Sequence, residues 1–339
     1  MLPPERSSRM KVNPPAVPTP GMAGGEKLNA MPAVTEVQPA QGASMGVAVE
    51  GSAMTAPGGL GDLPLPAFDN FNRQTRFVDV FNRGTEKFDY TTSADKPWIK
   101  LSRSAGTVLK SERLTVGIDW DQVSDGENNA IISIKQKDGA TVRVRVQAVR
   151  PATPARDSVQ GFVEAEHFVS IEAEHYTGKT DAGAVHWDQI PGFGETLSGM
   201  TIFPVTAASA EPPQAAPVLE YRMYLYETGA FHVEAVLAPT LNFVPGRGLR
   251  YAISFDDQPP QIVDALEHNS DRDWETAVSD GVRKVTSTLS VSAPGYHTLK
   301  FRMVDPGVVL EKLVISQGTV PSSYLGPPES YRGAAKFSR

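Results

Sequence analysis

Two copies of the tetrapeptide Glu-Ala-Glu-His stand eight residues apart, at 164–167 and 172–175. On a strand, Glu172 and Glu174 would point to the same face and hold their carboxylates about 7 Å apart. Such a pair could supply oxygen ligands to calcium, which takes about six to eight of them. It could equally be two solvated carboxylates at a sheet edge, the commoner situation for acidic strand residues. The separation also fits a glycosidase acid/base pair, but the neighbouring sequence indicates neither a cleft nor a raised pKa.

Trp187 and Trp274 are the aromatic candidates for ligand contact. They stand in the polar segments VHWDQIPGFG and SDRDWETAV, where an indole face could stack on a sugar ring. The alternative is that both pack inside a core, which is what we expect of Trp98 and Trp120. Together with Arg247, Trp187 and Trp274 make up the candidate sugar-binding residues.

Arg247 and Arg250 lie in the segment LNFVPGRGLRY, at 241–251. Two guanidinium groups this close in sequence could fork onto a carboxylate of a ligand. Their alternative role is a salt bridge within the chain, to Asp256 or Asp257.

Composition and motifs disfavour several other functions. The sequence has no GxSxG, HExxH or phosphate-loop motif, and its six histidines are not spaced as metal ligands. Zero cysteines exclude disulfides, thiolate catalysis and zinc–thiolate sites. The net charge is −7, with 14 basic against 23 acidic side chains in residues 151–339, so nucleic acid and anionic membranes are not expected partners. No apolar run approaches the ~18 residues of a membrane span.

Period-2 alternation predicts the elements that must position these residues. Residues 1–66 hold 11 of the 28 prolines and are expected to form an extended lead-in, rich in Pro and Met, with one strand-like segment at Met45–Glu50. Residues 67–150 are expected to form a small Ig-like β-sandwich, followed by a linker at 151–160. A type I′ turn is predicted at Asp138-Gly139. Strands of this sandwich are expected at 76–81, 114–120, 130–136 and 141–148.

Residues 161–320 repeat the pattern on a larger scale and are expected to form a jelly-roll β-sandwich. No segment of a dozen or more residues has a helical period, so the predicted fold class is all-β. Residues 321–339 are expected to form a tail that lies across the surface or frays. Strands are expected at 218–227, 230–237, 250–255, 283–291, 296–303 and 308–315.

The first residues give no export address. Met1–Lys11 contains Pro, Glu, Arg and Ser where a signal peptide would place its apolar stretch. The first residues therefore assign no compartment.

Eight segments spread over about 45–330 share the pattern of one enzyme family. They are Met45–Gly51 (MGVAVEG), Phe77–Gly84 (FVDVFNRG), Pro97–Ser102 (PWIKLS), Ile190–Met200 (IPGFGETLSGM), Ala238–Phe243 (APTLNF), Gly246–Pro259 (GRGLRYAISFDDQP), Met303–Leu310 (MVDPGVVL) and Ser323–Glu329 (SYLGPPE). Together, and in this order, they resemble the C-terminal region of glycoside hydrolase family 115.

The resemblance implies a non-catalytic accessory part of a xylan α-1,2-glucuronidase, an enzyme that removes glucuronic acid or its 4-O-methyl ether from xylan. In this family the acid/base carboxylates lie in an upstream barrel-like domain that Met1–Ser44 does not resemble, so no catalytic residue is assigned. The chain alone is expected to be inactive and to support or orient the catalytic domain of the same enzyme. Further expected partners are xylan or glucuronoxylan and a second copy in a homodimer. The alternatives are a free-standing carbohydrate-binding module and a complete enzyme with an unrecognised site.

The second sandwich also resembles the galactose-binding-like jelly rolls of carbohydrate-binding module families 6 and 35. Ile171–Tyr176 (IEAEHY) matches the start of their pattern and residues 295–315 match its end. This resemblance implies a structural calcium held by Glu172, Glu174 and Glu311, although the last position often holds Asp in those modules. No other cofactor is required. Because family members that degrade polymers are usually exported, the resemblance implies a periplasmic or secreted protein.

Overall fold

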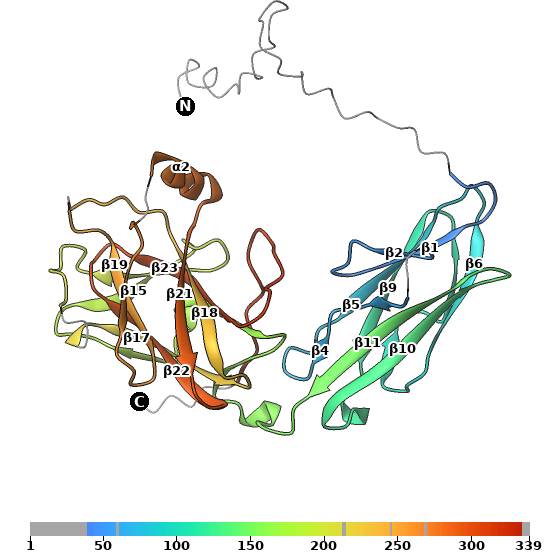
Figure 1. Ribbon diagram of the computed structural model, residues 1–339, viewed down its shortest axis with the longest axis horizontal. Coiled ribbons are helices and arrows are strands. Elements are labelled where there is room, and N and C mark those ends of the chain that lie inside the picture. Colours follow the sequence, from blue (N-terminus) through green and yellow to red (C-terminus); the bar gives the residue numbers. More distant parts are fainter. Residues whose placement is uncertain (1–38, 59–60, 212–214, 245, 268–269, 334–339) are drawn as a thin grey trace, which may run out of the picture.

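The computed structural model describes residues 39–58, 61–211, 215–244, 246–267 and 270–333. These residues form two β-sandwiches that lie side by side (Figure 1). The prediction of an all-β chain, with a smaller sandwich followed by a larger one, is confirmed. No helix among the described residues is long and apolar enough to cross a membrane.

The first sandwich packs a five-stranded sheet, in the order β2-β1-β5-β9-β7, against a six-stranded sheet. The second sheet has the order β3-β11-β10-β6-β8, and β4 also pairs with β11. Along β11, Val142, Val144 and Val146 are buried because alternate residues of a strand face the same side. The bounds are β1 Met45–Val49, β2 Thr55–Ala56, β3 Leu63–Pro64, β4 Phe68–Asp69, β5 Arg76–Asn82, β6 Phe88–Ala94, β7 Ile99–Leu101, β8 Ala105–Val108, β9 Ser111–Ile118, β10 Gly126–Gln136 and β11 Thr141–Arg150, with a 3-10 turn η1 at Trp120–Gln122.

The first sandwich already contains strands from the segment that was expected to be an extended lead-in. β1, the strand-like segment at Met45–Glu50, pairs antiparallel with β5 along its whole length. Met45, Val47 and Val49 are buried in the core of the sandwich. Their alternation is enough to add a strand, so this sandwich begins well before residue 67. Residues 1–38 lie outside the described residues.

A hairpin joins β10 to β11 at the expected place, but the predicted type I′ turn is wrong. The backbone N–H of Gln136 donates to the carbonyl of Ala140 (2.9 Å). Asp138 has a φ of 57°, whereas Gly139 is not among the residues with positive φ. A longer loop reverses the chain here, and only one of the two residues needs the left-handed region.

The second sandwich packs a seven-stranded sheet against a six-stranded one. The first sheet has the order β20-β19-β22-β17-β12-β24 with β14 paired to β17, and the second has the order β15-β16-β23-β18-β21 with β13 paired to β23. The face predicted to point inward on β17 is buried at Leu219, Tyr221, Met223 and Leu225. The bounds are β12 Gly161–Val163, β13 Phe168–Glu172, β14 Gly178–Thr180, β15 His186–Ile190, β16 Gly199–Phe203, β17 Val218–Leu225, β18 Gly229–Leu237, β19 Arg250–Phe255, β20 Gln261–Asp264, β21 Arg283–Val291, β22 Gly295–Met303, β23 Val309–Ser316 and β24 Arg332–Gly333, with 3-10 turns η2 at Arg156–Ser158 and η3 at Ala173–His175.

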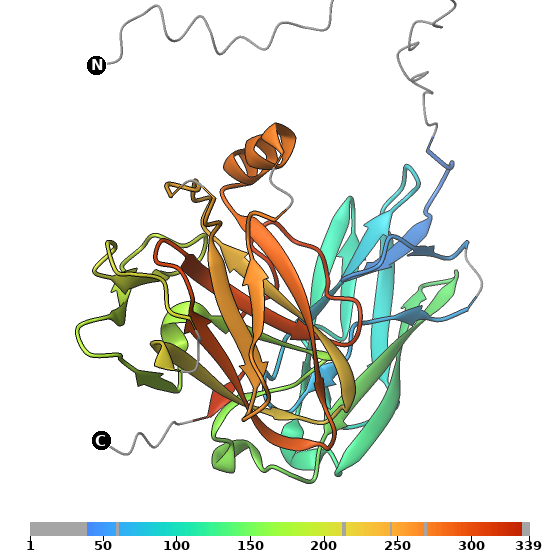
Figure 2. The same cartoon turned by 60° about the vertical axis from the view of Figure 1, so that its left-hand side comes forward.

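The described part of the chain has one α-helix, α2 (Asp271–Asp280), which connects β20 to β21 and was not predicted. Ser270 and Asp273 form a capping box, in which each side chain accepts a hydrogen bond from the other residue's backbone N–H. Gly281 ends the helix with a φ of 77°. The helix stands at one end of the second sandwich, and the chain that connects the two sandwiches lies at the other end (Figure 2).

The two sandwiches meet at an interdomain seam made by Phe71, Arg76, Val159, Glu166 and Tyr331. Phe71, from the first sandwich, packs in one apolar cluster with Val159, and its ring lies 6.0 Å from that of Tyr331. Arg76 Nη2 donates to Glu166 Oε1 across the seam (2.6 Å). Apolar burial and an ion pair therefore hold the sandwiches against each other beyond the peptide linker.

Candidate functional site

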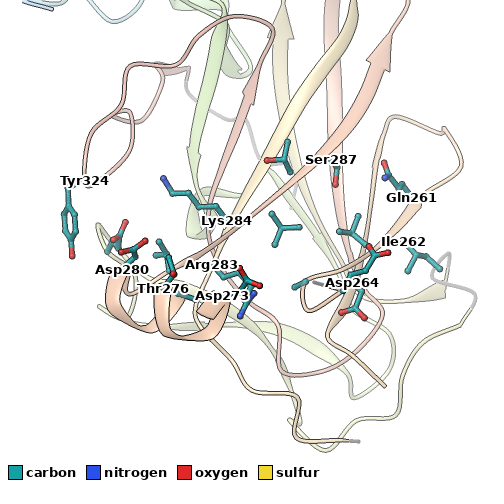
Figure 3. A pocket seen from close by; sticks show the side chains of 18 of the residues that line it. Gln261, Ile262, Asp264, Asp273, Thr276, Asp280, Arg283, Lys284, Ser287 and Tyr324 are labelled. Carbon is teal, nitrogen blue, oxygen red and sulfur yellow. The ribbon is translucent and has the colours of Figure 1, made fainter. Parts of the chain in front are cut away.

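An open groove of about 840 Å³ lies between β20 and β21, which are edge strands of the two sheets in the second sandwich. Tyr324 stands at one end of the groove and Gln261 at the other (Figure 3). The helix α2 closes one side of the groove. Because residues three and four apart share a helix face, Asp273, Thr276, Ala277 and Asp280 line the groove together.

The groove has an apolar floor and polar rims. The floor is the margin of the hydrophobic core, where the two sheets separate at their edges. Five carboxylates line the groove against two cationic side chains, so its formal charge is negative. The apolar residues are Ile262, Val263, Ala265, Ala277, Val282 and Val285; the charged ones are Glu195, Asp264, Glu267, Asp273, Asp280, Arg283 and Lys284.

Two of the groove carboxylates are held by the backbone. Asp264 Oδ1 accepts from the N–H groups of Leu249 (3.1 Å) and Leu266 (2.9 Å). Hydrogen bonds from the side chain and backbone of Ser270 lower the pKa of Asp273. Both carboxylates therefore keep fixed positions from which they can accept hydrogen bonds.

The structure places the two candidate tryptophans outside this groove. The prediction that Trp187 stacks on a sugar is wrong, because its side chain is 1% exposed. Its indole N–H donates to the carbonyl of Pro217 (3.1 Å), and its ring meets Phe301 edge to face (5.7 Å). Trp274 lies half-buried on α2 and does not line the groove, so its contact with a sugar stays a prediction.

Arg247 and Arg250 converge on a carboxylate of the chain itself. Arg250 forks onto Asp305 with distances of 2.8 and 3.2 Å, and Arg247 Nε lies 3.6 Å from the same carboxylate. Burial raises the pKa of Asp305, but hydrogen bonds from Arg250 and a serine outweigh it, so the net shift is downward. The partner is Asp305 rather than Asp256 or Asp257, because the turn before β23 lies beside the start of β19.

The residues proposed for calcium do not fit a calcium site. β13 ends at Glu172, and Glu174 lies in η3, so the two are not on one strand. The Lys312 ammonium lies 3.1 Å from Glu172 Oε1, and Thr196 donates to Oε2 (2.6 Å). Glu311 accepts from a backbone N–H instead. In the described ranges no three or more acidic or histidine side chains are grouped to hold a metal ion.

The second tetrapeptide fastens the C-terminal segment to the sandwich. His175 Nδ1 lies 2.8 Å from Glu329 Oε1, which also accepts from the backbone N–H of Glu172 (3.0 Å). Lys312 Nζ donates to the carbonyl of Leu325 (3.0 Å). The tail therefore lies across the surface as far as β24, which pairs with β12. Residues 334–339 lie outside the described part.

The first tetrapeptide forms a turn that reaches the other sandwich. Glu166 and His167 both have left-handed φ, at 53° and 66°, and the backbone groups of Ala165 and Phe168 close the turn with two bonds of 3.1 Å. Left-handed φ is unusual for residues other than Gly. The turn directs Glu166 to Arg76, so the strained residues sit at the interdomain seam.

Three buried or partly buried carboxyls have raised pKa values, and each has a structural partner. Burial raises the pKa of Glu164, of Glu166 and of Glu311. Glu164 Oε2 accepts from the backbone N–H groups of Tyr226 (2.6 Å) and Glu227 (3.1 Å). None of the three lines the groove between β20 and β21. The raised pKa values of these three residues therefore accompany structural contacts.

The groove residues were missed because α2 was missed. The capping box at Ser270 and Asp273, followed by Gly281, predicts a helix start and stop without any long period. A helix over these residues places Asp273, Thr276 and Asp280 on one face. The contribution of β20 and β21 could not be found this way, because it depends on the strand order.

Comparison with known proteins identifies a family pattern in the second sandwich. Residues 161–329 match the family model described as the glycosyl hydrolase family 115 C-terminal domain. No curated protein matches the chain in sequence.

The solved structures that match parts of the chain include an enzyme and two binding modules. A family GH115 4-O-methyl-α-glucuronidase with specificity for decorated arabinogalactans is 17% identical, with a TM-score of 0.33, over 52% of this chain and 20% of that one. The C-terminal CBM6 of LamC, a marine laminarinase from Zobellia galactanivorans, is 14% identical, with a TM-score of 0.31, over 44% of this chain and 99% of that one. A family 35 carbohydrate-binding module from Clostridium thermocellum is 17% identical, with a TM-score of 0.30, over 43% and 97%. This chain thus spans about a fifth of the length of the enzyme.

Proposed function

We propose that this chain, whose residues 161–329 form a glycosyl hydrolase family 115 C-terminal domain, is a non-catalytic accessory region of a xylan α-1,2-glucuronidase. Its proposed partner is the catalytic domain of the same enzyme, which it supports or orients. The family match supports a carbohydrate-related accessory role, and the eight segments that resemble the family extend the resemblance into the first sandwich. On this proposal the chain works outside the cytoplasm, where polymeric xylan is degraded.

The observation that carries this proposal is the interdomain seam. Phe71 is 1% exposed at the seam, and Arg76 pairs there with Glu166. An accessory region orients another domain only if its own parts keep a fixed relation. A seam that combines apolar burial with a half-buried ion pair supplies that rigidity, whereas a bare linker at 151–160 would not.

The proposal is tested by comparing a family 115 catalytic domain alone with the same domain joined to this chain. We expect kcat/KM for glucuronic acid release from polymeric glucuronoxylan to be higher in the joined enzyme. We expect Phe71→Ala with Arg76→Ala to remove most of that gain without unfolding either sandwich. Equal rates for the catalytic domain with and without the chain would refute the proposal.

The groove between β20 and β21 favours a second candidate function, a free-standing xylan-binding module. An open groove with fixed carboxylates, hydroxyl groups and an exposed tyrosine is suited to hydrogen-bond sugar hydroxyls. Retention of the chain on insoluble xylan, saturable and competed by soluble xylan, is the expected result. If the chain is not retained on insoluble xylan more than a protein that does not bind sugars, this candidate function is excluded.

A further inference from the structure

The groove between β20 and β21 contains a buried serine hydroxyl that makes no hydrogen bond to the backbone. Ser287, on the inward face of β21, is 3% exposed and lines the groove. Neither its Oγ nor the Tyr251 hydroxyl makes a hydrogen bond of normal geometry to a described residue. The two hydroxyls contact each other, and this contact partly offsets the burial that raises the pKa of Tyr251 to about 12. A ligand with its own hydroxyl groups would make the hydrogen bonds that this contact leaves unmade, because each hydroxyl has one donor and two acceptor positions.

The rest of the groove fits a ring that is apolar on its face and polar at its edge. Val263, Ala277 and Val285 line it as apolar side chains. Thr276 on α2 and Ser287 on β21 bring hydroxyl groups to it from two sides (Figure 3). A pyranose ring has C–H groups on its faces and hydroxyls around its edge. The apolar floor of the groove therefore suits the face of the ring, and the polar rims suit its hydroxyl groups.

Tyr324 provides an aromatic surface where the groove opens. Its side chain is 77% exposed, and it lies at the end of the groove opposite Gln261 (Figure 3). An exposed phenol ring beside a polar groove can stack on the face of a sugar ring. The groove therefore has room for a chain of rings rather than a single one.

The charge of the groove selects among such chains. Its lining has five carboxylates and two cationic side chains, so a ligand that carries a carboxylate is repelled. Neutral hydroxyl groups, in contrast, donate well to fixed carboxylates such as Asp264 and Asp273.

We infer that the groove between β20 and β21 binds a neutral chain of pyranose rings and disfavours rings that carry a carboxylate. The inference rests on the proposed carbohydrate-related role and names its ligand class. In the accessory region it would hold unsubstituted stretches of the polysaccharide main chain, away from the glucuronic acid branches.

Calorimetric titration of the whole chain tests this with two probes, xylohexaose and xylohexaose that carries one 4-O-methylglucuronic acid branch. We expect xylohexaose to bind with an affinity that changes little with salt. The branched probe should bind about tenfold more weakly at low salt, with a gap that narrows as salt is added. No binding of xylohexaose, or equal or tighter binding of the branched probe at low salt, would overturn the inference.

A matched pair of variants on α2 tests the location. Thr276→Trp fills the groove from the helix face that lines it, and we expect it to weaken xylohexaose binding by about tenfold or more. Val278→Trp adds the same bulk to an exposed residue that does not line the groove, and it should change the affinity less than about twofold. Equal loss in both variants, at unchanged melting temperature, would place binding elsewhere. These titrations contain no catalytic domain, so their failure leaves the orienting role untouched.

Discussion

The two copies of Glu-Ala-Glu-His have identical residues but different backbones and partners. In the first copy, Glu166 and His167 form a left-handed turn, and Glu166 meets Arg76 of the other sandwich. In the second copy, β13 ends at Glu172 and a 3-10 turn follows, whose His175 holds the C-terminal segment. The surroundings, rather than the tetrapeptide, decide both its conformation and its role.

The first glutamate of each copy shows the same contrast. Glu164 and Glu172 are almost equally buried, at 4% and 5% exposed. Backbone N–H groups stabilise Glu164, whereas the Lys312 ammonium and a hydroxyl stabilise Glu172. Buried charges need such partners. Both glutamates have such partners within the chain, so each copy of the tetrapeptide has a structural role.

The largest effect should follow from breaking the second copy. Glu172→Ala leaves the Lys312 ammonium, 5% exposed, without its counter-ion, which lowers the free energy of unfolding by about 3 kcal/mol. Urea unfolding followed by circular dichroism measures the loss. The double variant Glu172→Leu with Lys312→Met should recover most of it. If the double variant is as unstable as the single one, the ion pair is not the cause.

Breaking the first copy should have a smaller effect, because its ion pair is only partly buried. Arg76→Ala removes the counter-ion of both Glu50 and Glu166 and should lower the free energy of unfolding by about 2 kcal/mol. The control is Arg143→Ala, since Arg143 is exposed and only 3.5 Å from its partner Asp62; it should lose less than about 0.5 kcal/mol. Similar losses for both variants would argue against a special role of the seam.

The free energy of unfolding should depend on pH through Glu164, the first glutamate of the first copy. Burial raises the pKa of Glu164 above its ordinary value of 4.5, so the folded chain holds this proton more tightly than the unfolded chain. Its contribution is therefore fully present below pH 4.5 and is lost as the pH rises through the raised pKa. Glu164→Gln, which keeps an acceptor oxygen, should remove a decline of at most about 1.4 kcal/mol per pH unit. An unchanged slope of unfolding free energy against pH would disprove this.

The smallest expected effect concerns metal removal. Because Lys312 occupies the cation position beside Glu172, a chelator should leave the melting temperature unchanged to within about 1 °C. Differential scanning calorimetry with EDTA, and with added calcium as the control, measures this. A melting temperature that falls with EDTA and returns with calcium would restore the calcium hypothesis.

The strands could be predicted because each depends on local alternation. β19 and β21 have the predicted bounds, at Arg250–Phe255 and Arg283–Val291, since alternating apolar residues need only one buried face. β1 was recognised as strand-like, but its membership in the first sandwich depends on pairing with β5, more than 25 residues later. Long-range pairing of that kind leaves no local pattern.

The candidate site could not be predicted in the same way. Trp187 lies in a polar segment, yet strand alternation turns its side chain inward, where its N–H finds a carbonyl. The groove arises where two edge strands from different sheets separate, and the sequence alone does not give that strand order. The capping box at Ser270 was the local feature that a search for long helical periods passed over.

On the proposed function, this chain assists a glucuronidase without catalysing the reaction itself. Release of glucuronic acid from glucuronoxylan by the purified chain tests this most directly, with an active family 115 enzyme as the positive control. We expect no release above a blank without protein. Release that grows with the concentration of the chain, and that Glu164→Gln or Glu172→Gln abolishes while the fold is retained, would contradict it.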